Sequence, residues 1–266
     1  MKQYRLGFIG CGHMGMSIAR GVLNSSLLMA EEIAVYDPSE SVQDTCQELG
    51  FAVCGSETEL AQNAHIVVLA VTPQIVDRVL SKLKDVQIDC LLSIVAALSM
   101  KHIRDLAGEI PVIRVMPNTP LLVSCGAAAM CHTEDCDLDD IAFVTSLFEA
   151  LGVVRTIPEE QMNDIIAVHG STPAYFYYFL NSILKDTIRR GVDPETARTL
   201  LVQTMIGSGK LLEAEPDKPL EAFVDSVCSK GGTTIEAIRV FRHEDLDRMV
   251  KQANEECIRR AEELSK

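Results

Sequence analysis

Three glycines near the N-terminus have the spacing of a dinucleotide-binding turn. The motif G-x-G-x-x-G follows an apolar run at residues 6–9 and opens a helical pattern at residues 16–23. In such a turn the glycines allow a tight reversal, close approach of a diphosphate and close packing of the helix, whose N-terminal N–H groups face the anion. A tight turn without a ligand is the alternative. The predicted diphosphate site consists of Gly10, Cys11, Gly12, His13, Met14 and Gly15.

An acidic residue, Asp37, ends the next predicted strand at residues 32–37. An acid in this position hydrogen-bonds the 2′-hydroxyl of the adenine ribose and would repel a 2′-phosphate. Asp37 therefore favours NADH over NADPH. Two alternatives stay open, because Asp-Pro-Ser is also typical of a helix or turn cap, and because Ser39 and Ser41 could hydrogen-bond a phosphate. NADPH is therefore not excluded.

Two further loops carry groups that could bind a small substrate. The loop at residues 116–120, Met-Pro-Asn-Thr-Pro, places Asn118 between two prolines, where its amide offers a donor and an acceptor. A plain structural turn is the alternative. The loop at residues 229–234, Ser-Lys-Gly-Gly-Thr-Thr, could form a cradle of N–H groups for an anion. Its alternative is a capping loop in which Thr233 or Thr234 is the helix N-cap.

Apolar runs that alternate with amphipathic segments position these loops. They predict a doubly wound parallel sheet with helices between the strands, which is a Rossmann-type α/β domain over residues 1–157. The strand ends at Gly10, Val71, Ala96 and Met116 should face one crevice. Strands are expected at residues 6–9, 32–37, 51–53, 65–71, 90–96, 111–116, 126–131 and 153–157.

The remainder, residues 158–266, has the pattern of an all-helical domain. The run at residues 174–180, Ala-Tyr-Phe-Tyr-Tyr-Phe-Leu, is apolar nearly all round, so its helix must be buried by this chain or by another. A small helical domain has few ways to bury that surface alone, and we therefore expect a homodimer formed through it. Helices are expected at residues 160–170, 173–190, 194–214, 220–227 and 234–264.

Composition disfavours several classes of function. A net charge of −14 argues against non-specific nucleic-acid binding, and no apolar run is long enough for a membrane span. Nine cysteines without a C-x-x-C motif, and a start without a signal-peptide pattern, predict reduced thiols in the cytoplasm. The cluster of Cys131, His132 and Cys136 fits no zinc pattern, so no metal site is predicted.

Five motifs, taken in order, resemble those of the pyrroline-5-carboxylate reductase family. The resemblance covers essentially the whole chain, and its most specific parts are the loops at residues 116–120 and 231–237. It implies reduction of L-1-pyrroline-5-carboxylate to L-proline with NAD(P)H, the last step of proline synthesis. It also implies a Rossmann domain and an interlocking helical domain in a dimer, sometimes part of a decamer. The motifs lie at residues 7–14, 114–120, 173–175, 203–204 and 231–239.

The resemblance also implies roles for individual residues. Asn118 would lie near the nicotinamide ribose, and Thr234 would hydrogen-bond the ring nitrogen or the carboxylate of the substrate, as the candidate catalytic residue. A cyclic imine needs no strong enzyme acid, because hydride transfer requires chiefly that nicotinamide C4 be held about 3–3.5 Å from the imine carbon. The nicotinamide half would be lined by Val71, Thr72, Pro73, Ala96 and Ala97, and the substrate carboxylate would be held by Ser229, Gly231, Gly232, Thr233 and Thr234.

Four residues depart from the pattern usual in that family. Thr72 replaces a lysine, His169 a serine, Asn181 an acid and Lys230 a proline. Lys230 adds a cation beside the carboxylate cradle, and His169 is either a new acid or a core or capping histidine. Two other functions therefore stay open. One is a reductase of a different imine or ketone, such as another cyclic imino acid, and the other is a non-catalytic dinucleotide-binding regulatory protein.

Overall fold

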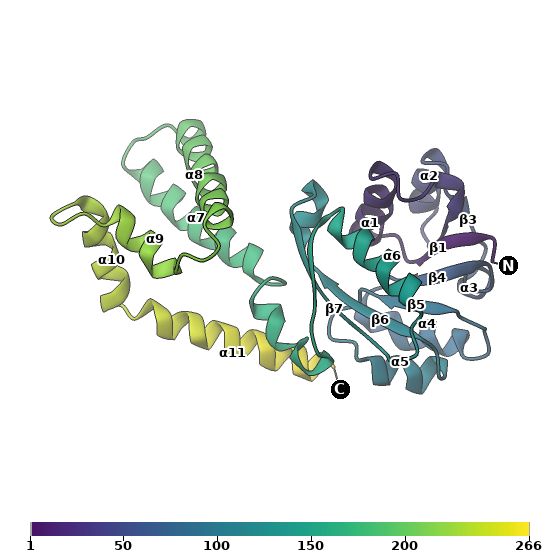
Figure 1. The fold of residues 1–266 in the computed structure, drawn as a ribbon. Helices are drawn as coiled ribbons and strands as arrows, with labels where there is room; N and C mark the ends of the chain where they lie inside the picture. The colour runs from purple at the N-terminus through teal and green to yellow at the C-terminus, as the bar shows by residue number, and fades with distance from the viewer. Residues whose placement is uncertain (1, 266) are drawn as a thin grey trace. The chain divides into compact units, whose positions relative to one another are not determined.

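The computed structural model describes residues 2–265, and its contacts divide the chain into two compact units (Figure 1). The first unit runs to Pro173 and resumes at Cys257, and the second comprises Ala174–Glu256. The boundary predicted between residues 157 and 158 follows the last strand of the sheet, whereas the first packing unit extends further along the chain. Among the described residues, no helix is long and apolar enough to cross a membrane.

The first unit contains an eight-stranded sheet of the Rossmann type. The predicted α/β fold is confirmed, with one correction to the parallel sheet. β7 is antiparallel to β6, because only a short 3₁₀ turn connects them and leaves no room for a crossover helix, and β8 runs in the direction of β7. The strand order is β3-β2-β1-β4-β5-β6-β7-β8. The strands are β1 Tyr4–Ile9, β2 Ile33–Tyr36, β3 Ala52–Val53, β4 Ala64–Leu69, β5 Cys90–Ser93, β6 Val112–Pro117, β7 Gly126–His132 and β8 Gly152–Thr156.

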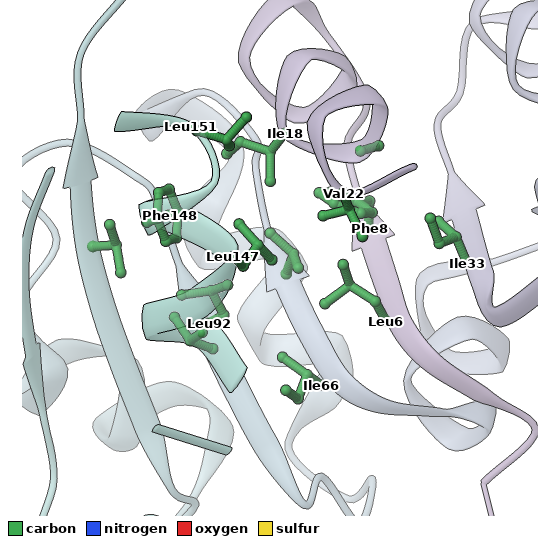
Figure 2. Packing of buried hydrophobic residues seen from close by; sticks show 14 of the residues in the cluster. Leu6, Phe8, Ile18, Val22, Ile33, Ile66, Leu92, Leu147, Phe148 and Leu151 are labelled. Atoms are coloured by element: carbon green, nitrogen blue, oxygen red, sulfur yellow. The ribbon is translucent and has the colours of Figure 1, made fainter. Parts of the chain in front are cut away.

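Two hydrophobic layers hold the helices against the sheet. Figure 2 shows the first layer, where α1 and α6 turn side chains such as Ile18, Leu147 and Phe148 toward Phe8 and Leu92 of the strands. Helix α2 contributes to the same layer, and α3, α4 and α5 form the second layer on the other face. These helices are α1 His13–Asn24, α2 Glu40–Glu48, α3 Glu57–Asn63, α4 Val76–Leu83, α5 Met100–Ala107 and α6 Leu138–Glu149.

The helix predicted at residues 160–170 is wrong, because two short 3₁₀ turns occupy this segment. Met162 is fully buried against Met116, Ala129 and Cys131 of the sheet, and this packing holds the segment across the strands rather than as a free helix. It also explains why the segment belongs to the first unit. The 3₁₀ turns of the chain are η1 Ala30–Glu32, η2 Pro73–Ile75, η3 Thr119–Val123, η4 Glu159–Gln161 and η5 Asp164–Ala167.

The second unit is helical, as predicted, but the single final helix expected at residues 234–264 is two helices. Asp245 adopts a left-handed backbone conformation with φ of 54°, which a continuous α-helix does not accommodate. Large apolar side chains lie exposed on this unit, including Tyr178 at 78% and Leu200 at 63%. The helices are α7 Thr172–Arg189, α8 Pro194–Ala214, α9 Leu220–Val227, α10 Thr233–His243 and α11 Leu246–Leu264.

Candidate functional site

The glycine turn lies between β1 and α1 and has the geometry of a diphosphate site. Gly10 has φ of +85°, and a Cβ there would lie 2.8 Å from the carbonyl oxygen of Ala70. A Cβ on Gly15 would lie 2.8 Å from the carbonyl oxygen of Gly10, whereas one on Gly12 would meet nothing within 4 Å. Two glycines are therefore required by packing, and the third leaves the backbone open to a ligand.

The N-terminus of α1 is free to receive an anion. Its N-cap is Gly12, no side chain caps it, and its first turn carries no acid. The first N–H groups of a helix have no partner within the helix, and the helix dipole favours negative charge there. The residues of this turn therefore fit the diphosphate of a nicotinamide dinucleotide, with His13 and Met14 at its start.

Asp37 directly follows β2 and joins the end of that strand to the glycine turn. Its Oδ2 accepts a 2.8 Å hydrogen bond from the N–H of Cys11, and its Oδ1 accepts a 3.0 Å bond from the N–H of Ser39. The side chain thus serves as a turn cap, while each oxygen keeps a lone pair with which it could accept a ribose hydroxyl. The hydroxyls of Ser39 and Ser41 are 3.0 Å apart and exposed, so the alternative of a phosphate site also fits the local geometry.

Buried thiols lie beneath this turn. Cys11 and Cys46 share a hydrogen bond, which raises the pKa of Cys11, as does its burial. The same bond lowers the pKa of Cys46, although burial opposes this. A second pair, Cys90 and Cys136, has the same arrangement, and its hydrogen bond lowers the pKa of Cys136 to about 6. Among the described residues, no group of three or more His, Cys, Asp or Glu side chains could hold a metal ion.

The residues predicted to line the nicotinamide half of the cofactor site lie where β4 and β5 end. These strands stop at Leu69 and Ser93, earlier than predicted, so residues 71–73 and 96–97 belong to the loops that follow. Thr72 is the N-cap of η2, but its side chain makes no capping hydrogen bond. The side chain of Val71 reaches within 3.0 Å of the position that a Cβ on Gly10 would occupy, which places this loop beside the diphosphate turn.

A small cavity of about 160 Å³ lies at these strand ends. Ala97 lines it and has φ of +59°, an unfavourable backbone conformation of the kind that clusters at functional sites. His102 also lines it, and its Nε2 lies 2.8 Å from the Oδ1 of Asp77. No local sequence pattern indicates this pairing, because the two residues lie on different helices. The other lining residues are Pro73, Val76, Val95, Ala96, Leu98, Leu264 and Ser265.

Asn118 is buried, and its side chain holds the loop that follows β6. Its Oδ1 accepts a 2.8 Å hydrogen bond from the N–H of Ala127, and its Nδ2 donates a 3.1 Å bond to the carbonyl oxygen of His169. The structure therefore supports the structural role that was left open for Asn118, and its contact with the nicotinamide ribose stays a prediction. Both ring nitrogens of the half-buried His169 lie within hydrogen-bonding distance of carbonyl oxygens, those of Ile165 and Met116, which favours a core or capping role over that of a new acid.

The loop at residues 229–234 belongs to the second unit. The alternative that Thr233 or Thr234 caps the following helix is wrong, because the N-cap of α10 is Gly232 and no side chain caps it. Gly231 has φ of +74°, and the N–H of Gly232 donates a 2.9 Å hydrogen bond to the carbonyl oxygen of Ser229. Both threonines are exposed. The helix N-terminus and their hydroxyls thus lie on the surface of this unit, as an anion cradle requires.

Comparisons with known proteins decide the family. Residues 159–264 match the family model for pyrroline-5-carboxylate reductase dimerisation, and residues 5–97 match that for NADP oxidoreductase, coenzyme F420-dependent. The chain is 34% identical to the pyrroline-5-carboxylate reductase of Haemophilus influenzae, over 99% of this chain and 98% of that protein. The chain belongs to the pyrroline-5-carboxylate reductase family. The resemblance drawn from the motifs is thereby confirmed.

Solved structures of the pyrroline-5-carboxylate reductase family share the fold over the full length. A Plasmodium falciparum pyrroline carboxylate reductase with NADP bound matches with a TM-score of 0.90 and 29% identity, covering 100% of both chains. The enzyme from Coxiella burnetii matches with a TM-score of 0.89 and 29% identity, also over 100% of both chains. The Rossmann-type domain followed by a helical dimerisation domain is therefore the architecture of this family member.

Proposed function

We propose that this chain reduces L-1-pyrroline-5-carboxylate to L-proline with NAD(P)H, as the last step of proline synthesis. The observation that carries the proposal is the 34% identity to a pyrroline-5-carboxylate reductase over 99% of the chain. Two loops support it, since Asn118 and the hydroxyl and N–H groups of residues 229–234 offer the donors that we propose hold the cofactor and the substrate carboxylate. We also propose a cytoplasmic homodimer formed through residues 158–266, with a larger assembly of dimers as an extension.

A bound nicotinamide dinucleotide would supply the hydride for the C=N bond. In this proposal the N–H groups of residues 10–15 hold its diphosphate, because the N-terminus of α1 is uncapped and a Cβ on Gly12 would meet nothing within 4 Å. The loops at residues 71–73 and 96–97 line the nicotinamide half, with Asn118 at the nicotinamide ribose. NADH is favoured by the carboxylate of Asp37, and NADPH stays the alternative through Ser39 and Ser41.

The substrate carboxylate is the group by which the protein would hold the imine. The exposed residues Ser229, Thr233 and Thr234, with the N–H groups of Gly231 and Gly232, offer hydroxyl and amide donors without a buried cation. Donors of this kind hold an anion by charge-assisted hydrogen bonds. The hydroxyl of Thr234 is the candidate to hydrogen-bond the ring nitrogen or the carboxylate, and Lys230 could shift the preference toward another cyclic imino acid.

Consumption of NADH or NADPH with racemic pyrroline-5-carboxylate, followed by absorbance, tests the proposal. We expect saturable turnover with formation of proline. Saturable cofactor binding without turnover of any cyclic imine would overturn the reductase and leave a dinucleotide-binding regulatory protein. Preferential turnover of another ring size would instead identify a relative with a shifted substrate. Parallel measurements with both cofactors decide between NADH and NADPH.

A further inference from the structure

A chain of hydrogen bonds joins the loop after β6 to the segment before α7. His169 Nε2 lies 2.8 Å from the carbonyl oxygen of Met116, and Nδ1 lies 3.1 Å from that of Ile165. The carbonyl oxygen of His169 accepts a 3.1 Å bond from Asn118, whose side chain also accepts a 2.8 Å bond from the N–H of Ala127. His169 therefore holds the end of β6 by its ring, at Met116, and the loop that follows by its main chain, at Asn118.

This loop forms part of the functional edge of the sheet. Strands β5 and β6 are parallel and paired up to Ser93 and Arg114, so Met116 near the end of β6 and Ala96 in the loop after β5 lie toward the same edge of the sheet. Asn118 directly follows β6 and is buried. A displacement of the loop would therefore move one border of the proposed nicotinamide half, and displacements of about 1 Å cost enzymes about 10²-fold in rate.

Only certain side chains can make the bond to Met116. Nε2 of histidine stands three bonds beyond Cβ, and a carbonyl oxygen only accepts, so the bond needs a donor at that distance from the backbone. Glutamine places an NH₂ group the same number of bonds from Cβ, whereas alanine has no donor. A comparison of the glutamine and alanine variants of His169 therefore tests the hydrogen bond to Met116 separately from the presence of the imidazole ring.

We propose that His169 is a positioning residue for the reaction, acting through Met116 and Asn118 to set the loop that borders the nicotinamide. This inference rests on the proposed function. The ring of His169 is half-buried, and both of its nitrogens lie close to carbonyl oxygens. The inference therefore gives His169 no direct role in proton transfer.

The test compares His169→Ala, His169→Gln and His132→Ala in the full-length protein. His132 is a matched control, because its Nδ1 also contacts a carbonyl oxygen, that of Thr133 at 3.0 Å, and it pairs with Ile113 at the opposite end of the β6–β7 ladder. The measurements are kcat, KM for each substrate, the melting temperature and, by fluorescence titration, the Kd for NADH and for NADPH.

We expect His169→Ala to lower kcat about tenfold and to raise the cofactor Kd severalfold, with a melting temperature close to that of His132→Ala. His169→Gln should restore most of both losses. Wild-type kcat and Kd in His169→Ala, or equal losses in the Ala and Gln variants, would overturn the inference. An inactive wild-type protein would instead overturn the proposed function, and the cofactor Kd values would still decide whether His169 positions the loop.

Discussion

The main-chain N–H of Cys11 donates a 2.8 Å hydrogen bond to the carboxylate of Asp37. The acid at the end of β2 thus contacts the glycine turn at the second position of the motif, with its charge beside the predicted diphosphate site. This carboxylate caps the turn, and in the proposed function it would also be a barrier to a 2′-phosphate. These two roles can be separated by experiment.

We predict that Asp37→Asn raises the ratio of kcat/KM for NADPH over NADH about tenfold, which corresponds to about 1.4 kcal/mol. The variant keeps one oxygen acceptor for a backbone N–H and removes the charge that repels a phosphate. Steady-state kinetics with both cofactors measures the ratio, and Asp44→Asn, an exposed carboxylate on α2, is the control. An unchanged ratio would show that Asp37 only caps the glycine turn and does not select between the two cofactors.

The exposed hydroxyl of Thr234 lies in the first turn of α10. We predict that Thr234→Ala lowers kcat/KM for the imine by about 30-fold, because a lost hydrogen bond to a charged group costs about 1.5–3 kcal/mol. Thr234→Ser keeps the hydroxyl and should retain most of the activity. Equal losses in the two variants would assign the effect to the methyl group, and no loss in either would remove Thr234 from the site.

The apolar surface of the second unit predicts how copies of the chain associate. Leu200 on α8 is 63% exposed, as is Leu122 in the first unit, so the two leucines form a matched pair. We expect Leu200→Asp to shift the protein toward monomer in sedimentation velocity, because burial of an unpaired charge in an interface costs several kcal/mol. Leu122→Asp should leave the dimer intact. A dimer that tolerates Leu200→Asp would locate the interface elsewhere.

A partly buried ion pair joins α3 to α4. Burial raises the pKa of the Glu57 carboxyl, but the 2.8 Å hydrogen bond from Lys82, a backbone hydrogen bond and the charges of Lys82 and Arg78 outweigh it, so the pKa lies below its ordinary value. A lowered folded-state pKa stabilises the protein above the unfolded pKa, and this contribution is lost as pH falls through the folded value.

We therefore predict that Glu57→Gln lowers the free energy of unfolding by about 1 kcal/mol at pH 7, after allowance for the half-exposed Lys82. The difference from the wild-type protein should shrink as pH falls below about 4, because the unfolded state is protonated there and the folded state becomes protonated at lower pH. Urea unfolding at a fixed protein concentration measures it at each pH, with Glu48→Gln as the exposed control. A difference that does not depend on pH would show that charge is not its source.

Much of the first unit could be predicted because its strands are continuous apolar runs with both faces covered, such as residues 64–69. The antiparallel direction of β7 was missed although the sequence carries its signal, since the predicted strands at residues 111–116 and 126–131 leave too short a connection for a crossover helix. The wrong helix at residues 160–170 has a different cause. Its apolar residues have helical spacing, and only the burial of Met162 against the sheet shows that they pack otherwise.

The local geometry was predictable where one short segment carries the whole signal, as in the glycine turn. At residues 229–234 the residue types left the N-cap open, and it is Gly232. The links between distant segments were not predictable. His169 meets Met116 and His102 meets Asp77 only because the fold brings their elements together, and no local pattern in the sequence records these pairs.

The first unit is made from two separate stretches of chain, and this has a consequence for its synthesis. Residues from Cys257 onward complete it, with Leu264 and Ser265 in the wall of the cavity beside Ala97, and with the hydroxyl of Ser265 bonded to Asn163. A ribosome delivers that stretch only after it has made the whole helical unit. The nucleotide-binding unit is therefore completed only after the helical unit that lies between its two stretches has been made.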